Sequence, residues 1–163
     1  MDIQQFLHEY NQGYRNFSEV DFQTATLQGA RLSGIDLRGA DLSGVDLRQA
    51  DLSRANLSQA DLTNANLSGA DLSGANLRGS KLRIANMRCS SLVGAVLTKA
   101  DMRCTNFEDA DLSGAILEDV ALNGANLRNA QLFNACILNS DLTEAEIEGA
   151  NLTGLKKCEA SVF

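Results

Sequence analysis

The sequence repeats with a period of five residues. From Phe17 to Leu152, every fifth residue is Leu, Ile, Met or Phe, at 28 positions without an exception. Two places before these large residues lie 27 positions, from Val20 to Ala150, of which nineteen are Ala. Large and small apolar residues therefore alternate, at spacings of two and three, along most of the chain.

This period excludes a helix and requires regular turning. At about 100° per residue, the apolar positions would scatter around the whole of an α-helix. A β-strand places residues i and i+2 on the same side, which suits the spacing of two. Because five is odd, a straight strand would turn the next large residue to the opposite side. The chain must turn once in every five residues to bury them all, which predicts a coil wound around its own core.

Turn-forming residues stand where this coil needs them. Twelve of the 13 Gly lie two places after a large apolar residue, as Gly29 and Gly34 do. A type II turn needs a positive φ there, which Gly adopts without steric cost. Elsewhere Gln, Asn, Arg or Asp often occupies this place, and Asn and Asp tolerate positive φ best. Pro, which would remove a backbone donor, is absent from the sequence.

Segments such as ADLSG and ANLSQ resemble the A(D/N)LXX signature of the pentapeptide-repeat family. The resemblance covers about 28 consecutive repeats over residues 16–154, which makes it very specific. The family is abundant in cyanobacteria, and the leader LHEYNQGYRNFS is similar to cyanobacterial ones. The resemblance implies an all-β fold, a right-handed quadrilateral parallel β-helix with four repeats per coil. About seven coils are then expected.

The sequence divides into three segments. Residues 1–15 form an N-terminal leader, residues 16–154 the repeats and residues 155–163 a C-terminal tail. The leader has apolar residues at helical spacing, Asp2 as an N-cap and Gly13 as a stop. It predicts a short helix over about residues 2–11 whose apolar face caps the first coil; docking of a partner by the same face is the alternative. The residues of this face are Ile3, Phe6, Leu7 and Tyr10.

Composition excludes several classes of function. The formal net charge is −7 and the isoelectric point about 4.6, so direct nucleic-acid binding through a basic surface is not expected. No apolar run approaches the ~18–20 residues of a membrane span, and the polar N-terminus does not resemble a signal peptide. We therefore expect a cytoplasmic location. The cysteines form no CxxC pair and no zinc spacing, so they are expected to be reduced thiols: Cys89, Cys104, Cys136 and Cys158.

The sequence offers no catalytic, metal or cofactor site. His8 is the only histidine and lies in the leader, so no Ser-His-Asp or Cys-His set can be assembled along the repeats. Carboxylates are numerous, but all are expected on a convex, solvated surface that neither raises a pKa nor excludes water. The protein is therefore predicted not to be an enzyme and to need no cofactor.

An acidic column is predicted on one of the four outer faces. Residues 20 apart should stack, and the face that begins at Phe22 is the most acidic, with a net charge of −3. Some pentapeptide-repeat proteins mimic DNA and bind DNA gyrase. Seven coils would span about 34 Å, and duplex DNA of that length carries about 20 phosphate charges, far more than the net charge of this face. Lys81 and Ala121 break the column, with Arg83 and Arg103 alongside. The simpler interpretation is that Asp suits this outward position and keeps the rod soluble. The acidic column comprises Asp21, Asp41, Asp61, Asp101 and Asp141.

Apolar residues occupy outward positions at one corner of three successive coils. The equivalent positions of earlier coils are polar, for example Ser53 and Asn56. Clustered exposed apolar residues usually mark a contact. Three interpretations stay open: the tail covers the corner through Leu155, Val162 or Phe163, a protein partner or a second copy binds it, or it has no special role. This corner patch comprises Val93, Val96, Ile116, Phe133 and Cys136.

Together these features predict a rigid, acidic, rod-shaped scaffold that acts through surface contacts with an unknown protein partner. A monomer or weak self-association is expected, with no membrane partner. The alternative function is a DNA-mimicking binder of gyrase, of the quinolone-resistance type.

Overall fold

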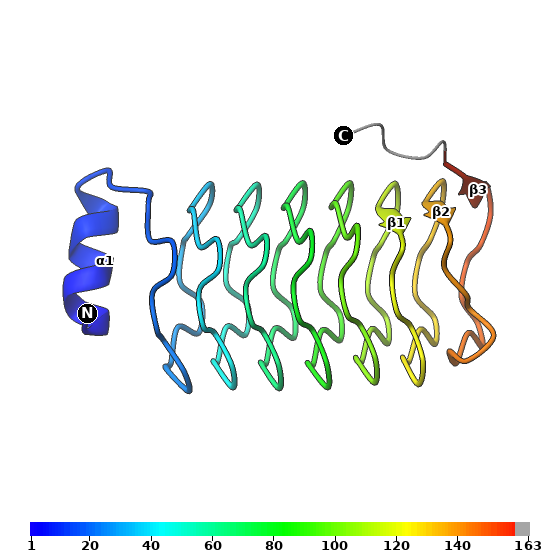
Figure 1. Ribbon diagram of the computed structural model, residues 1–163, viewed down its shortest axis with the longest axis horizontal. Helices are drawn as coiled ribbons and strands as arrows, with labels where there is room; N and C mark the ends of the chain where they lie inside the picture. The colour runs from blue at the N-terminus through cyan, green and yellow to red at the C-terminus, as the bar shows by residue number, and fades with distance from the viewer. Residues whose placement is uncertain (159–163) are drawn as a thin grey trace.

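The computed structural model describes residues 1–158 and shows a rod with a helix at its N-terminal end (Figure 1). The helix is α1, and three short strands lie toward the opposite end. Their bounds are Ile3–Asn11 for α1, Ile116–Glu118 for β1, Cys136–Leu138 for β2 and Lys156–Lys157 for β3. The strands form one parallel sheet in the order β1-β2-β3, in which Cys136 pairs with Ile116 on one side and with Lys156 on the other.

Along the rest of the rod, isolated parallel bridges join residues that are 20 positions apart. They run from Asn16↔Asp36 to Gln131↔Asn151. One coil therefore takes 20 residues, which is four of the five-residue repeats. In the regular coils, the N–H of the large residue donates to the next coil, as Leu67 N–H does to the Asn86 carbonyl at 2.7 Å. The predicted parallel β-helix preceded by a short helix is confirmed in these features.

The chain turns at the place two residues after each large apolar residue. There φ lies between 50° and 73° in 27 of the 28 repeats, and Glu144 is the exception. A backbone hydrogen bond within the turn closes it; for example, Ala65 N–H donates to the Leu62 carbonyl at 3.0 Å. The predicted positive φ is thus confirmed, and it is imposed even on Ile84, a β-branched residue that adopts this region at a cost.

Both apolar positions of each repeat point into one continuous core. The large residues from Leu32 to Leu132 are fully buried or nearly so, because the turns bring all four sides of a coil to the same axis. At the C-terminal end the burial weakens: Ile137 and Leu142 are half-buried, and Ile147 is 39% exposed. The hydrophobic effect therefore holds the middle of the rod most firmly.

Helix α1 lies across the first coil. The Asp2 carboxylate caps it by accepting the Gln5 N–H at 2.8 Å. The Phe6 ring is fully buried, with its centroid 4.7 Å from that of Phe17 and 4.8 Å from that of Phe22. The other three residues of the predicted face are partly buried against the same core, and the Tyr10 hydroxyl donates to the Ser33 carbonyl at 2.7 Å. They are Ile3, Leu7 and Tyr10.

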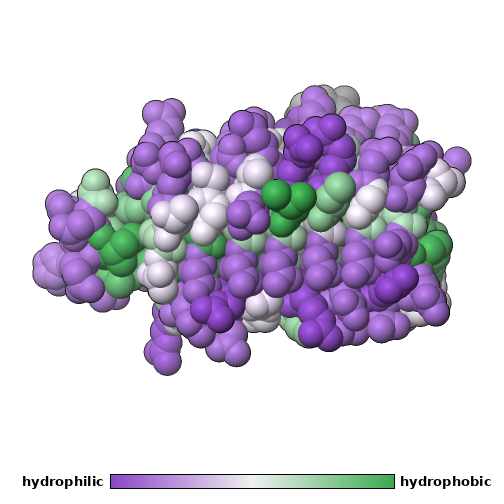
Figure 2. All heavy atoms as spheres, turned by 90° about the horizontal axis from the view of Figure 1, so that it is seen from below, coloured by the Kyte–Doolittle hydropathy of each residue, from purple (hydrophilic) through white to green (hydrophobic). Residues whose placement is uncertain are grey.

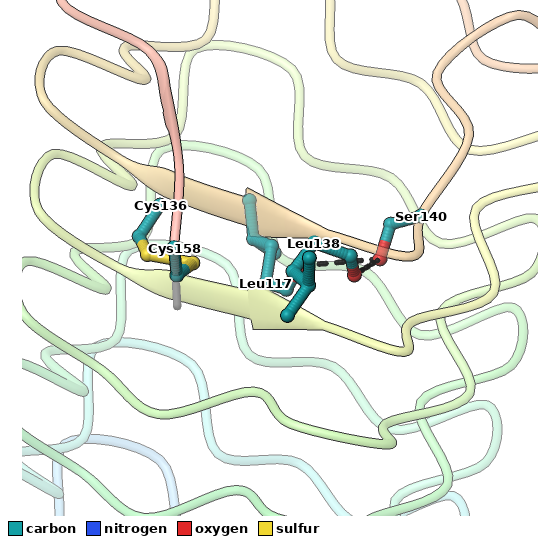
Figure 3. The surroundings of a disulfide bond; sticks show 5 residues. All are labelled: Leu117, Cys136, Leu138, Ser140 and Cys158. Carbon is teal, nitrogen blue, oxygen red and sulfur yellow. Dashed lines mark hydrogen bonds between the residues drawn. A yellow bond between two sulfur atoms is a disulfide. The ribbon is translucent and has the colours of Figure 1, made fainter. Parts of the chain in front are cut away.

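The regular hydrogen bonding changes at the corner that carries β1 and β2. Val120 N–H donates to the Ser140 hydroxyl at 3.0 Å, and this hydroxyl lies 3.1 Å from the Leu117 carbonyl (Figure 3). In regular repeats these two backbone groups bond to each other. Further along, Gly124 N–H bonds to the Glu144 carbonyl at 2.8 Å, one residue beyond the regular partner. The last coil is therefore out of step with the others over a short stretch.

Candidate interaction surfaces

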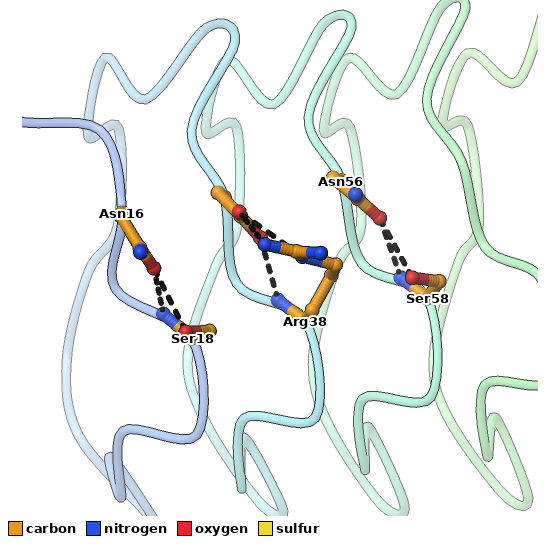
Figure 4. Close-up of polar contacts among 6 residues, drawn as sticks. Asn16, Ser18, Arg38, Asn56 and Ser58 are labelled. Atoms are coloured by element: carbon orange, nitrogen blue, oxygen red, sulfur yellow. Dashed lines mark hydrogen bonds and ion pairs between the residues drawn. The ribbon is translucent and has the colours of Figure 1, made fainter.

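The Asp or Asn that precedes a large apolar residue has a structural role in its own turn. Its Oδ1 accepts the backbone N–H two residues further on, in all 18 repeats that carry Asp or Asn at this place. Figure 4 shows this contact for Asn16 with Ser18 and for Asn56 with Ser58, each at 3.1 Å. The side chain satisfies a donor that the coil-to-coil ladder leaves free.

The acidic column consists of such turn acceptors. Each of its carboxylates takes the backbone N–H two residues on, at 2.8–3.3 Å. Asp61 is also 3.3 Å from the Lys81 ammonium, and Asp101 binds the Arg103 guanidinium through two contacts of 2.6 and 2.8 Å. Cations thus neutralise the middle of the column, where a DNA-like surface would need its charge.

Three carboxylates of the column, Asp61, Asp101 and Asp141, have a lowered pKa. Hydrogen bonds from Arg103 lower the pKa of Asp101, and a hydrogen bond from Thr143 lowers the pKa of Asp141. At Asp61 burial raises the pKa, but hydrogen bonds from Thr63 and Lys81 outweigh it, so the net shift is also downward. A general acid near neutral pH needs a raised pKa. These three carboxylates are suited to hold backbone and cations, and not to transfer protons.

The corner patch divides into an exposed pair and a half-buried column. Val93 is 41% and Phe133 46% exposed. Val96, Ile116 and Cys136 lie side by side, since Val96 bridges to Ile116 and Ile116 pairs with Cys136, and all three are half-buried. The structure therefore brings all five predicted residues to one corner, with different accessibility.

Two polar residues beside this column are unexpectedly buried. Thr98 and Glu118 follow a large apolar residue directly, a place that points outward in the repeat. They are only 4% and 8% exposed, whereas Arg38 is exposed at the equivalent place of an earlier coil. This part of the corner is therefore shielded from solvent, a feature that the sequence pattern did not predict.

The C-terminal tail, as far as it is described, lies at the same corner. Lys156 N–H donates to the Ala135 carbonyl at 3.1 Å, and Cys158 N–H donates to the Ile137 carbonyl at 3.3 Å. Leu155 packs against the core. The predicted contacts of Val162 and Phe163 lie outside the described residues.

The prediction that all four cysteines are reduced thiols is wrong for two of them. Cys136 and Cys158 form a disulfide with their Cα atoms 5.2 Å apart, whereas Cys89 and Cys104 are free and exposed. Figure 3 shows Cys158 on the outer face of the sheet, beside Cys136. The pair is 22 residues apart, one coil plus two, so a search for CxxC spacing could not find it. The sequence did contain a sign of this disulfide: Cys136 points outward by register, and the tail one coil later carries Cys158.

A comparison with known families identifies the repeats. The family described as pentapeptide repeats (8 copies) matches residues 16–54, 50–88, 82–119, 90–129 and 117–145. These matches together span most of the chain. The chain belongs to the pentapeptide-repeat family.

Solved structures of other pentapeptide-repeat proteins are similar to this one. A protein from the Arabidopsis thaliana thylakoid lumen is 34% identical over 65% of this chain and 67% of its own, with a TM-score of 0.47. HetL, involved in heterocyst differentiation regulation in the cyanobacterium Nostoc sp. strain PCC 7120, is 28% identical over 96% and 94%, with a TM-score of 0.29. Trypsin-treated QnrB1, a plasmid-mediated fluoroquinolone resistance protein, is 19% identical over 83% and 85%, with a TM-score of 0.50. No curated protein matches the sequence.

Membership of the pentapeptide-repeat family implies the right-handed sense of the β-helix, as does the likeness of the fold to trypsin-treated QnrB1. Proteins of the family are generally structural or interaction proteins. Within residues 1–158 of this pentapeptide-repeat protein, no three His, Cys, Asp or Glu side chains are grouped so that they could hold a metal ion. Over the same residues, no helix has the length and apolar character to cross a membrane.

One face of this pentapeptide-repeat protein is polar over most of its length. Figure 2 shows one face that is mainly hydrophilic, with apolar atoms at the two ends of the rod and in a short stretch near its middle. A shallow groove between coils is lined by polar and small residues, among them Arg48, Gly69 and Arg88.

Proposed function

We propose that this pentapeptide-repeat protein is a non-enzymatic scaffold, a rigid acidic rod of about seven coils that binds a protein partner at the corner patch. The observation that carries the proposal is the exposure of Val93 and Phe133. On their face, the residue directly after the large apolar residue is otherwise Ser or Thr in every coil, as at Ser53 and Ser113.

The two side chains are spaced for a single contact. They lie two coils apart, which is about 10 Å at the usual spacing of parallel strands. Phe133 adds an aromatic ring of the kind that is enriched at the centres of protein interfaces. Half-buried Val96 and Ile116 lie around the same corner and extend the apolar surface. A protein surface with a matching apolar pocket is the partner that this chemistry fits.

Affinity capture from the native host tests the proposal. The bait is the full chain, compared with the double variant Val93→Ser/Phe133→Ser, which restores the residue type that the face uses elsewhere. We expect the wild-type chain to capture a partner, and the double variant to capture at least tenfold less of it. Interface aromatic residues often contribute more than about 1.4 kcal/mol, which corresponds to a factor of ten in affinity.

A matched control changes an exposed apolar residue on another face. Ile84 is 53% exposed, and Ile84→Asn places a residue with better tolerance of positive φ there. This variant should retain the partner. If the double variant and Ile84→Asn capture the same proteins as the wild-type chain, the corner patch is not the binding site.

A DNA-mimicking binder of gyrase is the alternative function. QnrB1 is a plasmid-mediated fluoroquinolone resistance protein, and its likeness to this chain extends to the fold alone. The pairing of Asp61 with Lys81 and of Asp101 with Arg103 weighs against an acidic column that imitates phosphates. We expect no inhibition of gyrase supercoiling in vitro and no quinolone protection on expression. Inhibition with protection would reverse the order of the two functions.

The expected location and assembly stay predictions. They are a cytoplasmic location, a monomer or weakly self-associating chain, and partners that are neither nucleic acid nor membrane. Fractionation of the host with a tagged full chain tests the location, and light scattering of the purified protein over a range of concentrations tests the assembly.

A further inference from the structure

We propose that Cys136 and Cys158 form a redox-controlled latch. In the oxidised state the disulfide holds residues 155–158 against β2 at the end of the rod. In the reduced state this segment is released and β2 loses its pairing partner. The inference goes beyond the scaffold function, because it concerns how the tail is attached to the rod and does not depend on which partner binds.

The placement of the two cysteines is specific. Cys136 lies in β2, and its partner in the register of the sheet is Lys156, not Cys158. Cys158 follows β3 and reaches Cys136 because the chain crosses the outer face of the sheet there (Figure 3). Their Cα atoms are 5.2 Å apart, within the usual range for a disulfide. The bond is therefore an added connection between the tail and the rod, beyond what the ladder provides.

Without the bond, few interactions hold this segment. β3 has two residues, and the side chains of both Lys156 and Lys157 are exposed. The described backbone donors of the segment make bonds of 3.0 Å within the Leu152–Leu155 turn and of 3.1 and 3.3 Å to the coil below. Leu155 is its one partly buried apolar side chain, whereas a regular coil buries four large residues. Segments with so few buried contacts open more easily than the core.

Release of the segment would change the end of the rod. Because β3 pairs with β2, its loss leaves backbone groups along one side of β2 without their ladder partners. An unpaired strand edge is a site at which another chain can pair.

The chemistry of the latch is thiol–disulfide exchange. On closing, the two thiols lose two protons and two electrons and form the S–S bond, while a small-molecule or protein disulfide accepts the electrons and becomes two thiols. A dithiol reverses the reaction. Cys89 and Cys104 are exposed free thiols outside the pair, so they can be replaced without removing the latch.

The test uses the full chain with Cys89→Ser and Cys104→Ser, so that the pair is the only source of thiols. The protein is oxidised with glutathione disulfide or reduced with dithiothreitol and then alkylated, and its mass is measured by mass spectrometry. It is then digested with trypsin, and cleavage after Lys156 and Lys157 is followed by mass after reduction of the fragments. We expect both thiols to be protected in the oxidised protein and cleavage at these two lysines to be about tenfold slower than in the reduced protein, because local opening limits proteolysis.

The control variant adds Cys158→Ser, which keeps the backbone and nearly the size of the side chain. It should be cleaved at the fast rate with and without the reductant, while cleavage elsewhere in the rod stays slow in all samples and shows that the coils remain folded. Two results would overturn the latch: alkylation of both thiols after oxidation, or equal cleavage rates at Lys156 and Lys157 in the oxidised and reduced protein.

Discussion

Leu67 and Ser68 are neighbours in the chain, but the fold constrains them very differently. Leu67 is fully buried, whereas the Ser68 side chain lies half-buried at the surface, and the Ser68 N–H is satisfied by Asn66. We expect Leu67→Ala to open a cavity that costs about 2–5 kcal/mol of unfolding free energy. Ser68→Ala should change it by less than about 0.5 kcal/mol. Urea melts of both variants measure this, and equal losses would contradict the inward and outward assignment.

Asp51 illustrates how one carboxylate stabilises a turn. It accepts the Ser53 N–H at 3.0 Å and the Ser53 hydroxyl at 2.6 Å, and these bonds lower the pKa of the carboxyl group. We expect Asp51→Ala to cost about 1 kcal/mol, because the N–H loses its acceptor. Asp51→Asn keeps an acceptor, as Asn56 does in the next repeat, and should cost less. Melts at neutral pH compare the two.

The pH dependence at Asp51 has a definite sign. Because the folded-state pKa lies below the unfolded value of about 3.9, the ionised group stabilises the fold above that value, and the contribution is lost as the pH falls through the folded-state pKa. The advantage of the wild-type chain over Asp51→Asn should therefore be present at neutral pH and disappear in strong acid. An advantage that grows with acidity would show that the charge destabilises the turn.

At the scale of the element, α1 depends on one ring. Phe6 fills the end of the core against Phe17 and Phe22. We expect Phe6→Ala to cost about 3–5 kcal/mol, and deletion of residues 1–14 to expose the first coil and cause association of rods end to end. Thermal melts and light scattering measure the two effects.

The control for α1 is Gln4→Ala on its exposed side. This change should leave both the melting temperature and the monomeric state unchanged, because Ala is a good helix former. A deletion variant that stays monomeric with unchanged melting would mean that α1 serves another purpose, such as docking of a partner.

The elements show where sequence reasoning ends. The helix was predictable over about residues 2–11, against the observed Ile3–Asn11, because capping and apolar spacing are local signals. The strands β1 and β2 could not be predicted in this way. They lie where the Ser140 hydroxyl replaces the backbone hydrogen bond between Val120 and Leu117 that a regular turn would make. The Cys136–Cys158 bond was missed for a related reason: it depends on the path of the tail across the sheet, which no five-residue pattern encodes.

At the scale of the whole molecule, the sequence predicted the architecture well because every coil repeats the same constraint. Burial of two apolar positions in each five residues requires a turn, and the register of 20 follows from four such turns. The acidic column was predictable in position. Its role in the turns became clear only from the distances between the Asp oxygens and the backbone N–H groups.

The register also predicts which deletions the rod tolerates. Removal of residues 57–76 takes out one whole coil, so every remaining residue keeps a partner in the ladder. We expect a folded protein with a lower urea midpoint and an m-value reduced by roughly an eighth, in proportion to the surface lost. Circular dichroism and urea melts measure both.

A shorter deletion is the control. Removal of residues 57–74 takes out fewer residues but breaks the five-residue period, so polar side chains would turn inward at the junction. This variant should be less stable than the one that lacks the full coil. The opposite order of stability would contradict a fold set by the 20-residue register.

Bridges between residues 20 positions apart also determine how the chain can be made. Every coil closes over the same short loop, so the entropic cost of adding one does not grow with the length already folded. A ribosome that adds about 5–20 residues per second delivers a coil in about 1–4 seconds, long enough for it to dock before the next one emerges. Because Phe6 meets Phe17 and Phe22 within the first part of the chain, α1 and the first coil can serve as the template during synthesis. The rod can therefore assemble in the order in which it is translated, and the tail is the last part to settle.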